Sequence, residues 1–194
     1  MMTSIRSVCV YCGSSDAVGP AYYRLAEALG AELAAQGVRM VYGGGGVGLM
    51  GAAARAAHGN GGAVLGVIPR FLMAKERAYD AVEHRIVETM HERKKIMFDE
   101  SDAFIVAPGG IGTLEEAVET LSWMRLGLHR KPMAFLADDG YWDPFFALLD
   151  HTVRAGFTPA GFRDLIIDAR SPAQAIDALT ASIAVAREAR AVTY

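Results

Sequence analysis

Cysteine is scarce in this sequence, which has only Cys9 and Cys12 among its 194 residues. Two cysteines are too few for the disulfide framework of a small secreted protein. Their Cys-x-x-Cys spacing occurs in redox and zinc motifs, but no second pair and no suitably spaced histidine accompanies it. On a strand the two side chains would point to opposite faces, so we expect both cysteines to be structural.

Basic segments and long apolar runs are also missing. The formal net charge is -3 and no segment is strongly basic, which excludes the phosphate-driven binding of general nucleic-acid proteins. No run approaches the ~18 apolar residues that cross a membrane. The apolar run that ends at Gly13 is too short for the core of a signal peptide. The sequence therefore predicts a cytoplasmic protein that binds neither nucleic acid nor a membrane.

Several common catalytic motifs are absent as well. The five histidines are scattered, and none forms the His-Glu-x-x-His pattern of zinc hydrolases. No Gly-x-Ser-x-Gly elbow marks a serine hydrolase. Neither glycine-rich run is followed by the lysine of a Walker A loop. We therefore expect no metal site and no cofactor.

The sequence does contain a regular alternation of short apolar runs and longer amphipathic stretches. Strands are expected at 5–11, 39–42, 63–68, 84–88, 103–107, 132–136 and 165–167, and helices at 20–36, 49–57, 91–101, 113–127, 142–155 and 172–186. Such alternation predicts parallel strands with right-handed crossovers and helices on both faces. The expected fold is one Rossmann-like domain across residues 1–194, an α/β doubly wound parallel sheet whose ligands lie beyond the carboxyl ends of the strands.

The first glycine-rich run, 43–48, follows the second expected strand. Gly43-x-Gly45-x-x-Gly48 has the dinucleotide-binding spacing, but the acidic residue expected after the next strand is absent. Three interpretations stay open: a nicotinamide site, close packing of strand and helix, or backbone amides that line a nucleotide site. We favour the third, with Gly44 and Gly45 in contact with the nucleotide.

The second glycine-rich run, Pro108-Gly109-Gly110-Ile111-Gly112-Thr113, follows the fifth expected strand. Its glycines let the backbone approach a ligand closely. Thr113 offers a hydroxyl where a helix begins, and the free amides and positive end of that helix favour a phosphate. Without a Walker lysine, the run is suited to a monophosphate.

Glu116 admits two interpretations. Thr113-x-x-Glu116 has the spacing of a capping box, in which the carboxylate serves only the helix start. Alternatively, the carboxylate lies beside Trp123 on a second, partly shielded face, where it can be tuned for catalysis. That interpretation assumes a buried stripe on the opposite side of the helix, formed by Leu114, Val118, Leu121 and Leu128.

Arg93 is an arginine in an apolar stripe, between Ile96 and Met97 on the helix that begins near Met90. An arginine on the inward face needs an anionic partner. One interpretation is structural: Arg93 forms an ion pair or extends its stem along the apolar surface. The other is functional: Arg93 points at a substrate or at a catalytic carboxylate.

Three segments together resemble one protein family: Gly44–Gly51, Met90–Lys94 and Pro108–Glu116. The resemblance is to the Lonely Guy (LOG) family of cytokinin riboside 5′-monophosphate phosphoribohydrolases, often mislabelled as lysine decarboxylases. It covers nearly the whole chain and implies a Rossmann-like homodimer with sites near the subunit interface. It also implies that Arg93 and Glu116 are the catalytic pair. The nucleotide contacts that we expect are Gly44, Gly45, Glu76, Met90, Lys94, Gly109, Gly110, Ile111, Gly112, Thr113, Leu114, Glu115 and Ser122.

The resulting hypothesis is hydrolysis of the N-glycosidic bond of a purine nucleoside 5′-monophosphate, either AMP or a cytokinin nucleotide. Glu116 would stabilise the positive charge on the sugar or activate water, and Arg93 would help the base to leave. A non-catalytic carrier of a phosphorylated pterin cofactor could use the same phosphate loop. A nicotinamide oxidoreductase lacks a clear ribose clamp, and no lysine stands in an evident pyridoxal setting.

Overall fold

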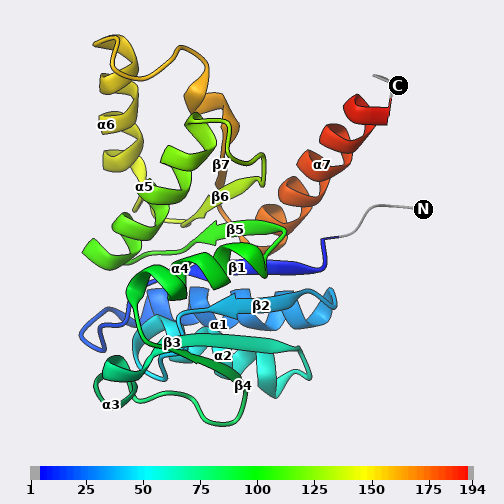
Figure 1. The fold of residues 1–194 in the computed structure, drawn as a ribbon. Helices are drawn as coiled ribbons and strands as arrows, with labels where there is room; N and C mark the ends of the chain where they lie inside the picture. The colour runs from blue at the N-terminus through cyan, green and yellow to red at the C-terminus, as the bar shows by residue number, and fades with distance from the viewer. Residues whose placement is uncertain (1–4, 192–194) are drawn as a thin grey trace.

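Seven parallel strands form the sheet at the centre of the molecule (Figure 1). The computed structural model describes residues 5–191, and of 186–191 only the backbone. The strands are β1 (Ser7–Tyr11), β2 (Arg39–Tyr42), β3 (Val64–Pro69), β4 (Glu83–Val87), β5 (Ala103–Val106), β6 (Met133–Leu136) and β7 (Ile166–Ala169). Their order across the sheet is β4-β3-β2-β1-β5-β6-β7. The predicted α/β doubly wound, Rossmann-like fold is confirmed.

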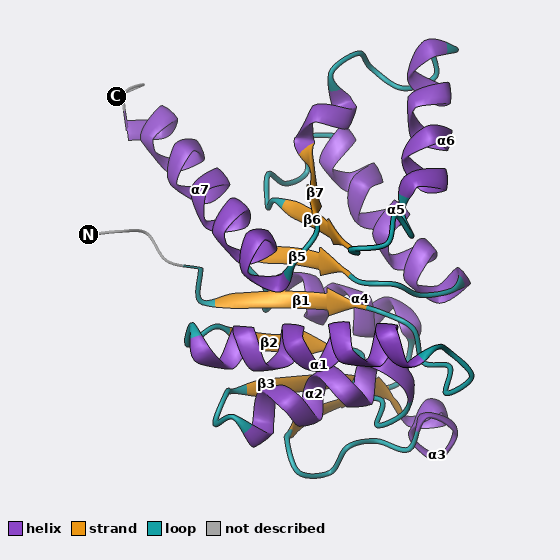
Figure 2. Ribbon diagram, turned by 180° about the vertical axis from the view of Figure 1, so that it is seen from behind, coloured by secondary structure: helices purple, strands orange, loops and turns teal. Residues whose placement is uncertain are grey.

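Helices cover both faces of this sheet, as the apolar strands require. The helices are α1 (Pro20–Ala35), α2 (Gly48–Gly59), α3 (Met73–Glu76), α4 (Met90–Asp99), α5 (Ile111–Arg125), α6 (Asp143–Arg154) and α7 (Pro172–Ala191). One core cluster joins α1, α2 and α7 to the sheet, and a second joins α4, α5 and α6 to the opposite face (Figures 1 and 2). Cys12 belongs to the first cluster and Cys9 to the second, so the predicted placement on opposite faces of the sheet is confirmed.

The strand order reverses between β1 and β5, and this reversal locates the site. β1 pairs with β2 on one side and with β5 on the other. The loops that leave the two strands therefore diverge to opposite faces and open a crevice between them, which is where doubly wound sheets bind ligands. The loop after β1 begins at Cys12, and the loop after β5 contains Pro108.

The segment 70–82 joins β3 to β4 and contains little regular structure. A single 3₁₀ turn, Arg70–Leu72, leads into the one-turn helix α3. The segment crosses the carboxyl ends of β2 and β3, where the backbone N–H of Gly46 donates to the carbonyl of Glu76 at 2.9 Å. This contact fixes Glu76 at the edge of the crevice.

The buried face of α5 differs from the predicted stripe. Thr113, Ala117, Thr120 and Leu121 are buried, whereas Val118 is 50% exposed and Leu128 is 70% exposed. Small side chains let α5 lie close to the sheet, where the Tyr11 hydroxyl meets that of Thr120 at 3.2 Å. Leu121 and Leu114 of the predicted stripe do pack against the core, so the hydrophobic pattern predicted the buried face only in part.

The capping-box interpretation of Thr113 and Glu116 is also wrong. The residue that caps α5 is Gly110, so both side chains lie inside the helix. A capping box does occur at the start of α4, where the Thr89 hydroxyl accepts from the backbone N–H of Glu92 at 3.1 Å. No helix in the described part of the chain is long and apolar enough to cross a membrane.

Candidate active site

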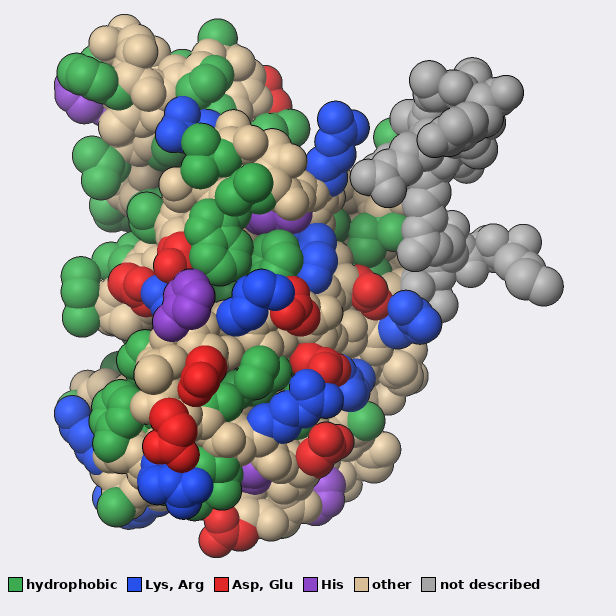
Figure 3. All heavy atoms as spheres, viewed as in Figure 1, with side chains coloured by type: hydrophobic (Ala, Val, Ile, Leu, Met, Phe, Trp, Pro, Cys, Tyr) green, Lys and Arg blue, Asp and Glu red, His purple; other side chains and the backbone are tan. Residues whose placement is uncertain are grey.

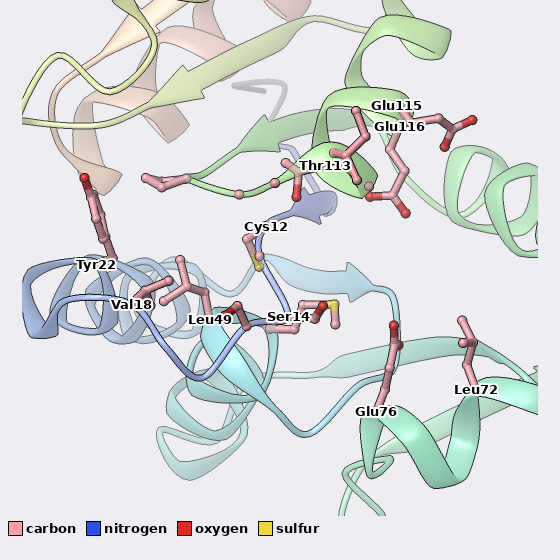
Figure 4. Close-up of a pocket in the computed structure, with 18 of the residues that line it drawn as sticks. Cys12, Ser14, Val18, Tyr22, Leu49, Leu72, Glu76, Thr113, Glu115 and Glu116 are labelled. Carbon is pink, nitrogen blue, oxygen red and sulfur yellow. The ribbon is translucent and has the colours of Figure 1, made fainter.

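A cavity of about 560 Å³ opens at the crevice between β1 and β5 (Figure 4). Ten of the predicted site residues line it: Glu76, Met90, Arg93, Gly109, Gly110, Ile111, Gly112, Thr113, Glu115 and Glu116. Arg93 and Glu116, predicted as the catalytic pair, thus share one cavity. They reach it from α4 and α5, which pack on the same face of the sheet.

The second glycine-rich run forms one wall of the cavity and leads into the 15-residue helix α5. The first helical hydrogen bond runs from the N–H of Leu114 to the carbonyl of Gly110 at 3.0 Å. The N–H groups of residues 111–113 precede this bond and therefore have no acceptor within the helix. A Cβ on Gly109 would lie 2.1 Å from the Thr113 hydroxyl oxygen, and only glycine fits there. The result is an amide-rich, positively polarised wall suited to an anion.

Arg93 is held rigidly at the ends of two strands. Its side chain is buried, with Nε donating to the carbonyl of Val67 at 3.1 Å and Nη2 donating to the carbonyl of Gly43 at 2.8 Å. The same Nη2 lies 3.6 Å from Oε2 of Glu76. The predicted anionic partner is therefore present, and the guanidinium is fixed as a stationary positive charge.

Glu116 is a carboxyl group with a strongly altered affinity for protons. Burial raises its pKa to about 7, and the nearby Arg93 opposes that rise. The negative charges of Glu115 and Glu76 add to it. A carboxyl group that titrates near neutral pH in a cavity is suited to acid–base chemistry and to stabilising a transient positive charge.

Glu76 faces Glu116 across the cavity, from α3 (Figure 4). Its Oε2 is buried and has no hydrogen-bond partner within residues 5–191. Burial raises the pKa of Glu76, and the charge of Arg93 opposes that rise. Glu76 therefore adds a second, largely buried carboxyl group to the wall of the cavity.

Five of the predicted nucleotide contacts do not line the cavity. The side chain of Lys94 extends from α4 to α5, where its Nζ forms ion pairs with Glu115 at 2.5 Å and Glu119 at 2.9 Å. Ser122 borders a separate groove between α5 and α6. The remaining three are Gly44, Gly45 and Leu114. For these five residues, contact with a nucleotide stays a prediction.

The first glycine-rich run and the start of α2 pack closely against the loop after β1. The N–H groups of Leu49 and Met50, at the start of α2, both donate to the carbonyl of Gly13. Gly48 has a φ of +57° and approaches the Ser14 backbone so closely that a Cβ would lie 2.5 Å from its carbonyl carbon. This geometry favours close packing of strand and helix among the three interpretations of the run.

The structure also brings to the cavity residues that sequence reasoning missed. Ser14 and Ser15 lie in the loop after β1, and the rule that ligands bind beyond strand ends could have indicated them. Tyr22 comes from α1 and Tyr141 from the loop between β6 and α6. No local pattern marks these tyrosines, because only the tertiary fold brings them to the crevice. Within residues 5–191 no three His, Cys, Asp or Glu side chains are grouped to hold a metal ion.

Comparison with known proteins places the chain among enzymes. Residues 50–179 match the family described as "Possible lysine decarboxylase". A probable cytokinin riboside 5′-monophosphate phosphoribohydrolase of Oryza sativa subsp. japonica is 50% identical over 84% of this chain and 73% of its own length. The cytokinin riboside 5′-monophosphate phosphoribohydrolase LOG3 of Arabidopsis thaliana is 43% identical over 86% of this chain and 78% of its own.

Solved structures give the same fold. The molybdenum cofactor binding protein of Rippkaea orientalis superposes with a TM-score of 0.69 and 25% identity, over 94% of this chain and 99% of its own. The molybdenum cofactor carrier protein of Chlamydomonas reinhardtii gives 0.70 at 24% identity, over 92% and 98%, and at that identity it supports the fold alone. The family match and the 43–50% identity to proteins of that name show that this chain belongs to the LOG family of phosphoribohydrolase-like proteins.

Proposed function

We propose that this protein hydrolyses the N-glycosidic bond of purine nucleoside 5′-monophosphates, with AMP and cytokinin riboside 5′-monophosphates as the substrate class. The observation that carries the proposal is one cavity that combines an amide-rich helix start with the pair Arg93 and Glu116. The names of the relatives support the same reaction. We also propose a cytoplasmic location, on the ground of the low cysteine content.

Binding begins with the 5′-phosphate at the start of α5. The amides of residues 111–113 and the positive helix end receive the anion. Anchoring the phosphate orients the ribose relative to Glu116, which lies about one turn further along the same helix. Glu76 lines the opposite side of the cavity. The substrate is thereby held between two carboxyl groups and one fixed guanidinium.

The chemical step adds water across the bond between the ribose and the base. That bond breaks, its electron pair stays with the base, the base takes up a proton, and the hydroxyl of water ends on the sugar. The sugar passes through an oxocarbenium-like state. An ionised Glu116 either stabilises the positive charge of that state or accepts a proton from the attacking water. Arg93 cannot readily give up a proton at neutral pH, so it assists the departing base electrostatically.

The proposal is tested by chromatography of the products formed from a panel of nucleotides. We expect free base and ribose 5-phosphate from AMP and from N6-isopentenyl-AMP. Adenosine should be a poor substrate, because it lacks the phosphate that the start of α5 binds; one lost charge-assisted contact of about 1.5–3 kcal/mol lowers kcat/KM by roughly 10- to 100-fold. Equal turnover of AMP and adenosine would contradict the phosphate-anchoring step.

A carrier of a phosphorylated cofactor is the second candidate, because the Rippkaea orientalis protein is named for molybdenum cofactor binding. A carrier would hold its ligand through the same helix start and release no base from any nucleotide. The product assay therefore separates the two functions directly. The relatives at 43–50% identity favour the hydrolase.

We further propose that the protein forms a homodimer through α5 and α6. Val118 and Leu148 are 50% and 61% exposed, on either side of a groove of about 250 Å³. Figure 3 shows hydrophobic side chains gathered along this edge of the molecule. Ile111, at the rim of the cavity, is 84% exposed on the same helix, so a second copy on this face would lie near the site.

The dimer proposal predicts the behaviour of Leu148→Asp. A charge in the middle of an apolar interface is left unpaired, and we expect sedimentation to show a shift from dimer to monomer at micromolar concentration. Val185→Asp, which replaces an exposed apolar side chain on α7, is the matched control and should stay dimeric. A wild-type protein that sediments as a monomer would refute the proposal.

A further inference from the structure

The hydroxyl of Tyr141 donates a hydrogen bond of 2.7 Å to the carbonyl oxygen of Gly109. Tyr141 belongs to the loop between β6 and α6, and Gly109 to the glycine-rich run that leads into α5. This contact joins two loops that are 32 residues apart in the sequence. Both residues line the cavity. The contact is therefore a link between a remote loop and the wall that we propose binds phosphate.

The tyrosine itself is held in a fixed position. Its backbone N–H donates to Oδ1 of Asp139 at 3.1 Å, a turn in which a side chain caps the backbone. Its ring packs edge-on against Trp142 at 4.9 Å and against Tyr22 at 5.6 Å between centroids. Trp142 is buried against Phe135 beneath it. The hydroxyl thus projects from a rigid support.

The glycine-rich run is fixed on its other side by the carbonyl of Pro108, which accepts from the N–H of Gly13 at 3.0 Å. Neither Gly109 nor Gly110 has a side chain, so each has unusually wide conformational freedom. A peptide unit is planar and trans, so the carbonyl of Gly109 and the N–H of Gly110 point in opposite directions. Holding the carbonyl of Gly109 therefore also fixes the direction of the Gly110 N–H.

We propose that Tyr141 is a positioning residue that presents the backbone amides of the glycine-rich run to the substrate phosphate. This inference rests on the proposed function, since it assumes that the run binds a 5′-phosphate. Tyr141 orders the amides before the substrate arrives, so the entropy of ordering the loop is not lost on binding. Its effect is confined to ligands that carry the phosphate.

The test is Tyr141→Phe, which removes the hydroxyl and keeps the ring that packs on Trp142 and Tyr22. We expect a roughly tenfold weaker affinity for ribose 5-phosphate by calorimetry and a roughly tenfold higher KM for AMP, the order of one hydrogen bond. The kcat for AMP and the kcat/KM for adenosine should stay within about twofold. Tyr79→Phe is the matched control, because its hydroxyl contacts His58 and its ring does not line the cavity.

Two results would overturn the positioning role while leaving the proposed function standing. One is a Tyr141→Phe protein with wild-type affinity for ribose 5-phosphate. The other is an equal loss on AMP and adenosine, which indicates a general packing role. Failure of the proposed function is distinguishable, because it is seen in the wild type: a protein that releases no base and binds no ribose 5-phosphate refutes both.

Discussion

Glu116→Gln is expected to lower kcat for AMP hydrolysis by about 10²–10⁴-fold. Glutamine keeps the shape of the side chain but cannot become a carboxylate, so it neither stabilises a positive sugar nor accepts a proton from water. The affinity for ribose 5-phosphate should change little, because the phosphate contacts lie at the start of α5. Base release measured by chromatography, together with calorimetry for the product, separates the two quantities.

The pH dependence gives this prediction a signature of its own. The pKa of Glu116 is raised to about 7 by burial, and the proposed role requires the ionised form. We therefore expect kcat/KM of the wild type to fall roughly tenfold per unit as the pH drops below about 7. A wild-type rate that is flat between pH 5 and 7 would show that an ionised Glu116 is not required.

Stability measurements distinguish lost chemistry from a lost fold. A carboxyl group with a raised pKa in the native state binds protons there more tightly than in the unfolded chain, so its burial destabilises the native state progressively as the pH rises from 4.5 to about 7, and fully above that. Glu116→Gln should therefore be more stable than wild type at pH 8, by at most about 3 kcal/mol, and nearly equal at pH 4. Glu83→Gln, at an exposed site at the start of β4, should change neither kcat nor stability measurably.

Most of the fold follows from sequence periodicity because both faces of the sheet are covered. Each strand is a short apolar run, and each crossover contains a helix, so order and direction are strongly constrained. The buried face of α5 could be predicted only in part in this way. The helix places Ala117, Thr120 and Leu121 against the core and leaves Val118 exposed, because its small side chains let the backbone lie close to the sheet.

The candidate site was only partly visible in the sequence. Arg93 could be identified because a charged residue stood at an inward position of a helix, and the helix start at residues 109–113 has a recognisable composition. The position of Glu76 depends on a one-turn helix and on the 3.6 Å approach to Arg93. The contact of Tyr141 depends on a loop 32 residues away from Gly109. Such tertiary contacts leave no periodic signal.

Arg93→Ala is expected to reduce activity and stability together. The substitution leaves the carbonyls of Gly43 and Val67 without their donor, and it leaves Glu76 without its nearest positive charge. Unsatisfied buried groups of this kind destabilise a protein by about 2–5 kcal/mol in total. The loss of electrostatic help to the departing base should lower kcat by about 10²–10⁴-fold. Thermal unfolding and base release measure the two effects separately.

Two further variants show which part of the loss belongs to chemistry. Arg93→Lys keeps the charge but cannot donate to both carbonyls in the same geometry, so we expect it to recover part of the rate. Arg85→Ala removes a half-exposed arginine that pairs with Glu100 at 2.6 Å, and it should change stability by about 1 kcal/mol or less and leave kcat unchanged.

Because Arg93 opposes the rise in the pKa of Glu116, Arg93→Ala should also move the acidic limb of the pH–rate profile above about pH 7. An acidic limb that stays in place in Arg93→Ala would mean that the guanidinium and the carboxylate do not act on each other.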